Sequence, residues 1–475
     1  MKFVPLHEEH SNTCHSARCG SRGLYAKLIA FLVMFAVAFA AYGQSDGIQS
    51  RVENAASLIR NNRIPEAERQ LTSILNVAPN NQDALNLLGT IRAQQGKLDD
   101  AETLLTRAAK IDPNFVPVHM NLALLYLLKN SPEKTILELR QVIILEPNND
   151  EANYKLARLL LSGGQTDECI VVIEKAKLQK PDTLIFASLL GDAYLKKGDS
   201  EKAEENYRQL IAAQANSVDA LVGLAKVFQS RGDEKSTATY LSEARQAAKN
   251  SPELLYKIGV AALELKAFEQ AQTILEEAVK IEPSESKYLT ALGATLLKKS
   301  DLFAAEKVFY LAVESKPGNA QAQMYLGYVL YKQKKLAEAK KHLQKTVQAD
   351  SNSPEPLYYL GVIAQEENED EQAVPLLEKA IKLSPAFANA HVALGASYLK
   401  LKDYVRSQQE LELGVKLNPN DSKGHYQLAL LYARLKDPKR AQAEMQVVEK
   451  LKAVEESEKR QGDTFVIMPS APNLR

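Results

Sequence analysis

Cysteine and histidine, the side chains that most often bind transition metals, are few in this 475-residue chain, which has three cysteines and seven histidines. Their densest group is the segment HSNTCHSARC, which places His10, Cys14, His15 and Cys19 within ten residues. Zinc sites use these residue types, but at characteristic short spacings. The group lies in an N-terminal segment that we expect to be removed, so we predict no metal site there.

The histidines beyond this segment are His119, His342, His391 and His425. Three of them, His119, His391 and His425, are separated in the sequence by multiples of 34. On neighbouring helices, His391 and His425 would be a two-histidine metal site, but no third histidine and no carboxylate accompanies them at a fixed spacing. We interpret them as partly buried structural side chains and expect neither a metal nor a cofactor.

Motifs of the common enzyme classes are not found in the sequence. It has no glycine-rich phosphate loop, no HExxH, no CxxC and no Gly-x-Ser-x-Gly elbow. The acidic run EENEDE, residues 366–371, fits a solvated loop and the start of a helix, because acidic side chains favour helix N-termini. We therefore predict no catalytic residue and expect a chain that is not an enzyme.

The N-terminus has the features of an export signal. The apolar run over residues 28–42 is 15 residues long, whereas a membrane span needs about 20. Basic residues precede the run and small residues follow it, which predicts a signal peptide over residues 1–43 and an exported chain, periplasmic or extracellular. The alternative is an uncleaved anchor formed by residues 28–42, which would be the only link to a membrane. Without the signal, Cys169 is the one remaining cysteine, so stability must come from packing.

Composition favours a helical protein without a nucleic-acid partner. The chain has 59 basic and 59 acidic residues, and this balance gives no reason to expect nucleic acid. It has no tryptophan, and it is rich in Ala, Leu, Glu, Lys and Gln, which favour helices. Its length exceeds what one compact core accommodates, so several domains or an array of repeats is expected.

A repeat period of 34 organises most of the chain. The segments ALNLLGTIRAQQGKLDDAETLLTRAAKIDP (84–113) and AHVALGASYLKLKDYVRSQQELELGVKLNP (390–419) share an early Leu-Gly and a terminal Asp-Pro or Asn-Pro. The period predicts twelve tandem repeats over residues 48–455 without an insertion. They begin at residues 48, 82, 116, 150, 184, 218, 252, 286, 320, 354, 388 and 422.

Small residues and proline recur at fixed positions of the repeat. Position 8 is always Gly or Ala, as at Gly327, and position 20 is small, so Cys169 at position 20 is read as a buried filler. Position 32 is Pro in eight repeats, which ends a helix. Each repeat is therefore predicted to be two antiparallel helices, at positions 1–14 and 17–31. Because one pair cannot bury its apolar face, the pairs must stack into an all-α superhelix, a solenoid.

These positions resemble the tetratricopeptide repeat, whose period is also 34 and which has small residues at positions 8, 20 and 27 and Pro at position 32. The resemblance covers about 408 of the 475 residues. It departs from the family at position 4, which is never Trp here, and at position 27, which is large in some repeats, as at Ile74. The strict period of 34 argues against the 35-residue pentatricopeptide family, which binds RNA.

The resemblance also implies a binding surface. In the family, positions 2, 5, 9, 12 and 13 line the concave face, where ligands usually bind. In this chain they give apolar and aromatic patches in repeats three and four and in repeats nine and ten, with two more tyrosines at position 5. The candidate partner-binding residues are Met120, Leu124, Leu127, Tyr154, Arg158, Tyr256, Met324, Tyr328, Tyr331, Tyr358, Val362 and Tyr426.

Two interpretations of these tyrosines stay open. Tyrosine gives a large contact area with few torsions, which suits binding, but it is also common at these positions whatever the ligand. We expect that changing Tyr328, Tyr331 and Tyr358 to Ser leaves melting nearly intact. The clamp that some family members use for acidic C-termini is not matched, because Asn86 and Asn121 lack their lysine partners.

Two local features depart from the regular repeat. Pro375 falls inside a second helix, so a kink is predicted there. From Pro438 the helical pattern runs on through the last repeat, so residues 456–475 are predicted to be a helix extension and a flexible tail.

The sequence thus favours an exported, non-enzymatic scaffold that binds an extended peptide or a partner helix in the concave groove. The identity of its protein partner is not given by the sequence. The alternative is a periplasmic component of a polysaccharide secretion or outer-membrane assembly system, with tyrosines that touch sugar.

Overall fold

The structure is a computed structural model that describes residues 47–179 and 184–460. Within these ranges every regular element is a helix, and no strand occurs. The expected signal peptide lies outside the described residues, and so does the expected tail after residue 460. No helix in the described part of the chain has both the length and the apolar character needed to cross a membrane.

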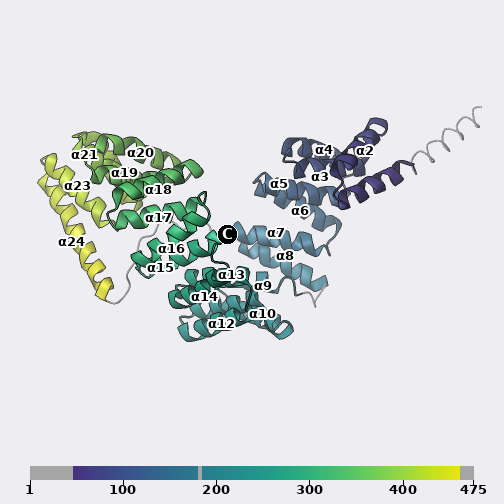
Figure 1. The fold of residues 1–475 in the computed structure, drawn as a ribbon, viewed down its shortest axis with the longest axis horizontal. Coiled ribbons are helices and arrows are strands. Elements are labelled where there is room, and N and C mark those ends of the chain that lie inside the picture. Colours follow the sequence, from purple (N-terminus) through teal and green to yellow (C-terminus); the bar gives the residue numbers. More distant parts are fainter. Residues whose placement is uncertain (1–46, 180–183, 461–475) are drawn as a thin grey trace, which may run out of the picture. The chain divides into compact units, whose positions relative to one another are not determined.

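The helices alternate as the period predicts (Figure 1). After a helix over residues 47–60, the first helices of the repeats are α3 (Gln82–Gln94), α5 (Val116–Leu128), α7 (Asp150–Ser162), α9 (Ala187–Lys197), α11 (Val218–Ser230), α13 (Pro252–Glu264), α15 (Ser286–Lys298), α17 (Ala320–Lys332), α19 (Pro354–Glu366), α21 (Ala388–Lys400) and α23 (Ser422–Arg434). The second helices are α2 (Ile64–Val77), α4 (Leu98–Ile111), α6 (Pro132–Leu145), α8 (Thr166–Gln179), α10 (Ser200–Ala213), α12 (Glu234–Ala247), α14 (Phe268–Ile281), α16 (Leu302–Ser315), α18 (Leu336–Ala349), α20 (Asp370–Leu383), α22 (Tyr404–Leu417) and α24 (Pro438–Arg460). The expected all-α fold of helix pairs is confirmed.

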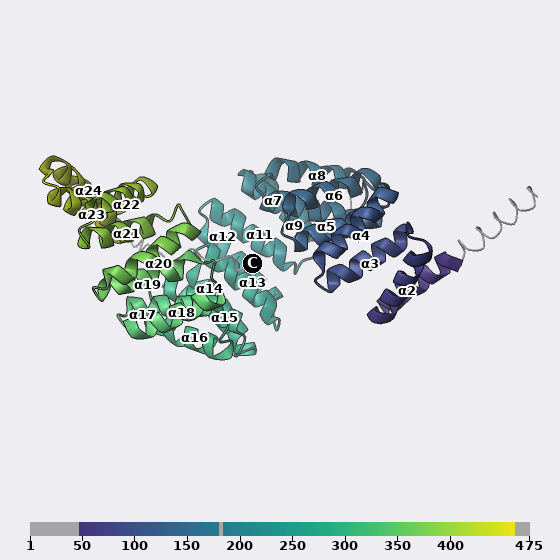
Figure 2. The ribbon, with the colours of Figure 1, turned by 90° about the horizontal axis from the view of Figure 1, so that it is seen from above.

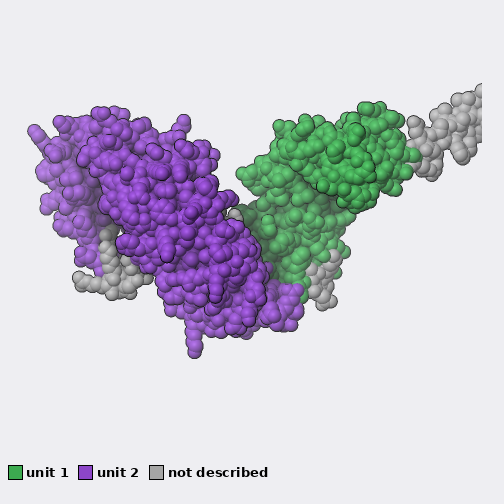
Figure 3. All heavy atoms as spheres, in the orientation of Figure 1, with its two compact units in different colours: residues 1–193 green, residues 194–475 purple. Residues whose placement is uncertain are grey.

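The repeats group into two compact units, residues 1–193 and residues 194–475, which Figure 3 colours separately. The boundary falls inside α9, after Ala193. Within each unit the helix pairs stack in chain order, as Figures 1 and 2 show. The unbroken repeat period gave no sign of this division.

The turn inside each repeat depends on one residue in the left-handed backbone region. This residue is at position 15 in all twelve repeats, with φ between 51° and 88°. Glycine adopts this conformation without steric cost, and Asn tolerates it better than other residues. The twelve residues are Asn62, Gly96, Asn130, Gly164, Gly198, Gly232, Lys266, Ser300, Lys334, Asn368, Lys402 and Lys436. The second half of the array therefore carries more strained turns than the first half.

Close approach of the two helices explains the small residue at position 8. A Cβ atom added to Gly327 in α17 would lie 2.7 Å from Cγ of Leu343 in α18, closer than van der Waals contact allows. At Gly293 the nearest atom would be Cε1 of Phe309, at 2.6 Å. Cys169, at position 20, is fully buried, as expected.

The two local departures have different outcomes. The helix α20 continues through Pro375 without a break, and the kink expected there stays a prediction. The helix α24 has 23 residues, against 14 in α22, which confirms the extended last helix.

Candidate functional site

The first predicted patch lies on α5 and α7 and is open to solvent. Leu124 and Leu127 are 40% and 43% exposed, and Arg158 is exposed as well. Met120 and Tyr154 are half-buried. The patch therefore offers an apolar contact surface to a partner.

The side chains of Asn86 and Asn121, which lie beside this patch, are hydrogen-bonded to each other. Nδ2 of Asn121, in α5, donates to Oδ1 of Asn86, in α3, at 2.8 Å. This hydrogen bond connects the first helix of repeat two to the first helix of repeat three.

The second predicted patch forms a cavity of about 410 Å³, which we call the tyrosine pocket. Five consecutive repeats contribute to it, mainly through their first helices. It contains three of the predicted residues together with seven that were not predicted. Its lining residues are Leu297, Ser300, Leu302, Tyr328, Tyr331, Lys332, Tyr358, Tyr359, Asn389 and Lys423. Residues up to 126 positions apart in the sequence thus converge on one site.

Tyr359 holds the aromatic cluster of the pocket together. Its ring centroid lies 5.2 Å from that of Tyr328, 5.8 Å from that of Tyr331 and 4.9 Å from that of Tyr358. Such edge-on and tilted arrangements are the favourable ones for aromatic pairs. Sequence reasoning missed Tyr359 because position 6 is not among the positions that were expected to line the concave face. Its adjacency to Tyr358 was the available signal.

Two predicted residues turn out to be core rather than surface. Met324 and Tyr328 are 6% and 3% exposed and belong to the main hydrophobic cluster of the second unit. The Tyr328 ring is covered by Tyr359 from the next repeat. The expectation that Tyr328 can be truncated without loss of stability is therefore wrong.

The other predicted residues have separate surroundings. Val362 is half-buried and packs against the cluster of Ala364 and Leu377. The Tyr256 ring packs at a tilt against that of Tyr288, with ring centroids 5.3 Å apart, and Tyr426 is 43% exposed. None of these three predicted residues lines the tyrosine pocket.

The phenol groups of the pocket stay protonated. The Tyr331 hydroxyl donates to Oε1 of Glu366 at 3.0 Å, and burial followed by this carboxylate raises the pKa of Tyr331. Burial raises the pKa of Tyr358 to about 12. At neutral pH these side chains therefore present neutral rings and hydroxyl groups. Lys332 adds a positive charge, with Nζ 5.9 Å from the Tyr328 ring centroid.

The repeated histidines are paired with carboxylates, contrary to the expectation from the sequence. Nδ1 of His119, His391 and His425 lies 2.6, 2.6 and 2.5 Å from Oε2 of a glutamate 19 residues further on. These partners are Glu138, Glu410 and Glu444. This fixed spacing was missed because it joins the two helices of one repeat. Among the described residues no group of three or more His, Cys, Asp or Glu is placed to hold a metal ion.

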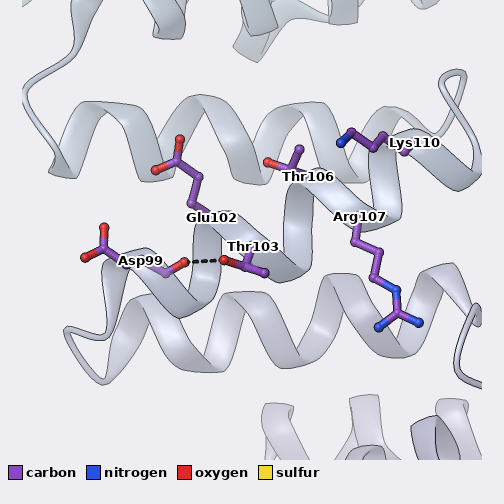
Figure 4. A pocket seen from close by; sticks show the side chains of 6 residues that line it. All are labelled: Asp99, Glu102, Thr103, Thr106, Arg107 and Lys110. Atoms are coloured by element: carbon purple, nitrogen blue, oxygen red, sulfur yellow. Dashed lines mark hydrogen bonds between the residues drawn. The ribbon is translucent and has the colours of Figure 1, made fainter.

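A larger cavity, of about 520 Å³, lies on α4 and is a weaker candidate (Figure 4). Its polar side chains serve neighbouring repeats: Glu102 accepts from Lys129 at 2.5 Å, and Arg107 donates to the carbonyl oxygen of Pro79 at 2.8 Å. In Figure 4 the lining residues all come from this one helix. They are Asp99, Glu102, Thr103, Thr106, Arg107 and Lys110. The tyrosine pocket, which five repeats build, is the better candidate for binding.

Comparison with known families gives matches over most of the chain. One model described as tetratricopeptide repeat matches residues 52–114, 188–252 and 290–354. A second model with the same description matches residues 126–193, 229–294 and 364–431. Together they cover all but short stretches of residues 52–431.

Two curated proteins are similar to parts of the chain. Cellulose synthase operon protein C of Pseudomonas fluorescens is 23% identical over 197 residues, which are 39% of this chain and 15% of that protein. BBSome complex member BBS4 of Bos taurus is 24% identical over 176 residues, which are 37% of this chain and 34% of that protein. The chain thus matches about a third or less of the length of either relative.

Solved structures include similar helical arrays. PilF of Pseudomonas aeruginosa is 21% identical, with a TM-score of 0.39, over 46% of this chain and 99% of that chain. Yeast Tom70 is 14% identical, with a TM-score of 0.38, over 88% of this chain and 98% of that chain.

Proposed function

We propose, from the premise that the chain belongs to the tetratricopeptide repeat family, that it is an exported scaffold that binds an extended peptide or a partner helix in the tyrosine pocket. Proteins of this family bind protein partners and are generally not enzymes. The observation that supports the location is the convergence of five repeats on one cavity with aromatic walls. Tyrosine suits such a role because it offers a large, rigid contact area with a polar tip.

The patch on α5 and α7, in the first unit, is a separate candidate surface for a partner. Leu124 and Leu127 are exposed on a helix that is apolar on all sides, and a helix of this kind is normally buried. Exposed apolar patches often mark contact sites for partners. A partner bound in the first unit would therefore cover these leucines.

Affinity capture from the envelope fraction of the source cells tests this function. We expect the mature chain to retain a protein partner, and Tyr331→Ser to weaken retention, because Tyr331 lines the pocket and is only half-buried. Phe303→Ser is the matched control, since Phe303 is 79% exposed on α16 and outside the pocket. Equal retention by both variants would contradict binding in the pocket.

A second proposed function rests on the similarity to cellulose synthase operon protein C. In this proposal the chain is a periplasmic component of a polysaccharide secretion or outer-membrane assembly system, and the tyrosines contact sugar. Retention on immobilised glycan, with no protein partner that depends on Tyr331, would favour this function over the protein-binding scaffold.

A further inference from the structure

We infer that the segment bound in the tyrosine pocket is a peptide in which acidic side chains alternate with aromatic or aliphatic ones. This inference rests on the proposed function and adds the chemistry of the partner. The pocket supplies an apolar wall from its tyrosines and leucines, together with two lysines and an asparagine. No acidic residue lines it. For a chain with equal numbers of acidic and basic residues, this is a local excess of positive charge.

The two lysines of the pocket are not paired with a carboxylate of the protein. Lys332 and Lys423 form no ion pair with any described residue, and the amide of Asn389 has no hydrogen-bond partner among them. Neighbouring lysines are engaged: Lys334 pairs with Glu366 at 2.8 Å and Lys335 with Glu306 at 2.6 Å. The ammonium groups of the pocket are therefore available to a ligand.

The carboxylates of Glu366 and Asp421, near the pocket, have hydrogen-bond donors of their own within the protein. Glu366 accepts hydrogen bonds from Tyr331 and from Lys334. Asp421 caps α23, where its carboxylate accepts the backbone N–H of Lys423 at 3.1 Å. Neither carboxylate forms an ion pair with Lys332 or Lys423, so both ammonium groups can pair with an acidic partner.

The walls of the pocket strengthen an ion pair formed there. Exposed ion pairs in water contribute little, but apolar walls reduce screening and focus the field of the lysines. Aromatic or aliphatic side chains of the partner would pack on the rings of Tyr331 and Tyr358 and exclude water. The two lysines come from repeats nine and twelve, so acidic groups spread along the segment fit better than one terminal carboxylate.

Binding of blocked peptides to the full chain tests the inference. The probe is the fluorescent heptapeptide GSEFESG, acetylated and amidated, and its matched neutral form is GSQFQSG. We expect the acidic peptide to bind at least about tenfold more tightly, which corresponds to about 1.4 kcal/mol. The preference should shrink between about 50 and 500 mM salt, because salt screens the charges.

Variants assign this preference to the pocket. Lys332→Gln combined with Lys423→Gln should remove the tenfold preference and leave the neutral peptide unaffected. Lys379→Gln combined with Lys416→Gln is the matched control, since these exposed lysines lie on the second helices α20 and α22. All four lysines are exposed, so we expect unchanged thermal unfolding in both double variants.

Several outcomes would overturn the inference. It fails if both peptides bind equally well, if the control variant loses as much affinity as the pocket variant, or if GSQFQSG with a free C-terminal carboxylate binds as well as GSEFESG. It also fails if a 20-base-pair DNA duplex competes as well as the peptide, since this would indicate a general polyanion surface. If a captured partner still depends on Tyr331 in these cases, the proposed function stands and only the acidic character is wrong.

Discussion

Nδ1 of His391 lies 2.6 Å from Oε2 of Glu410, and this contact joins the two helices of one repeat. Nε2 of the same ring lies 3.0 Å from the carbonyl oxygen of Pro385, at the end of the preceding repeat. A single imidazole thus connects α21, α22 and the preceding turn. His119 and His425 repeat the arrangement, so it is a recurring structural connection of this array.

Repeat nine contains the same connection with its residues exchanged. Here Gln323 occupies the histidine position and His342 the glutamate position, with Nδ1 of His342 2.7 Å from Oε1 of Gln323. Nε2 of Gln323 donates to the carbonyl oxygen of Pro317 at 3.0 Å. Burial, followed by the charges of Lys345 and Lys341, lowers the pKa of His342, which favours the neutral ring as the donor to Gln323.

This exchange predicts that two compensating substitutions restore the connection in repeat eleven. His391→Gln alone places an amide against the Glu410 carboxylate and should lower the free energy of unfolding by about 1–2 kcal/mol. His391→Gln with Glu410→His recreates the pair of repeat nine and should recover most of that loss. Urea denaturation measures both variants, and equal loss in the single and double variants would contradict the coupling.

Helix packing at position 8 predicts a graded response to added volume. Gly327→Leu should destabilise by about 1–3 kcal/mol, because Leu343 already fills the space. Gly293→Ala should cost more than Gly327→Ala, because the ring of Phe309 is more rigid than the Leu343 side chain. Gly47→Ala is the control, since no atom lies within 4 Å of an added Cβ there. Thermal unfolding followed by circular dichroism compares the four variants.

The strained turns predict that some lysines can be replaced with a gain in stability. Lys402 has φ of 67°, where a side chain meets steric conflict, so Lys402→Gly should raise the free energy of unfolding by up to about 1 kcal/mol. Lys379→Gly, in the interior of α20, is the matched control and should lower it by about 1 kcal/mol. A loss of stability in both variants would show that the turn is not strained.

The fold was accessible from the sequence because its determinants lie at fixed positions. The recurrence of small residues at positions 8 and 20 and of Pro at position 32 needs no tertiary information, and the helix pairs follow from it. The site was only partly accessible. Asn389, Lys332 and Lys423 occupy positions 2 and 13, which were expected to face the groove, but every candidate residue was chosen at positions 5, 9 and 12.

The position of a residue within the 34-residue repeat does not determine how deeply its side chain is buried in the pocket. Position 9 faces the next repeat, and whether its side chain is covered depends on the residue that the next repeat presents. In repeat nine this residue is Tyr359, which covers Tyr328. In repeat three, Leu124 at the same position stays 40% exposed. The same position is therefore core in one repeat and surface in another.

Tyr328 and Tyr331 should consequently respond differently to truncation. Tyr328→Ser removes a ring that is 3% exposed and should cost about 3 kcal/mol or more. Tyr331→Ser removes a half-buried ring with one hydrogen bond to Glu366 and should cost about 1 kcal/mol. Hydrogen exchange of α17 and α19 measures the loss locally, which suits an array whose repeats need not unfold together. Similar protection in both variants would contradict the assignment of Tyr328 to the core.

Acid should weaken the contact between repeats two and three through Glu102. Oε2 of Glu102 accepts from Lys129 at 2.5 Å, and Oε1 accepts from Lys134 and from Tyr126, both at 3.1 Å. The hydrogen bond from Lys129 is the largest cause that lowers the pKa of Glu102, from 4.5 to about 2. Because the folded state binds this proton more weakly than the unfolded state, the stabilisation is complete above pH 4.5 and disappears as the pH falls towards 2.

Glu102→Gln should therefore lower stability at pH 7 by no more than about 1 kcal/mol, since the carboxylate is partly exposed and screened by water. The urea midpoints of the variant and the parent chain should converge between pH 4.5 and 2. Glu133→Gln is the control, because Glu133 is exposed on α6 and makes no ion pair among the described residues. A difference between parent and Glu102→Gln that persists unchanged at pH 2 would mean that the lost contact is not ionic.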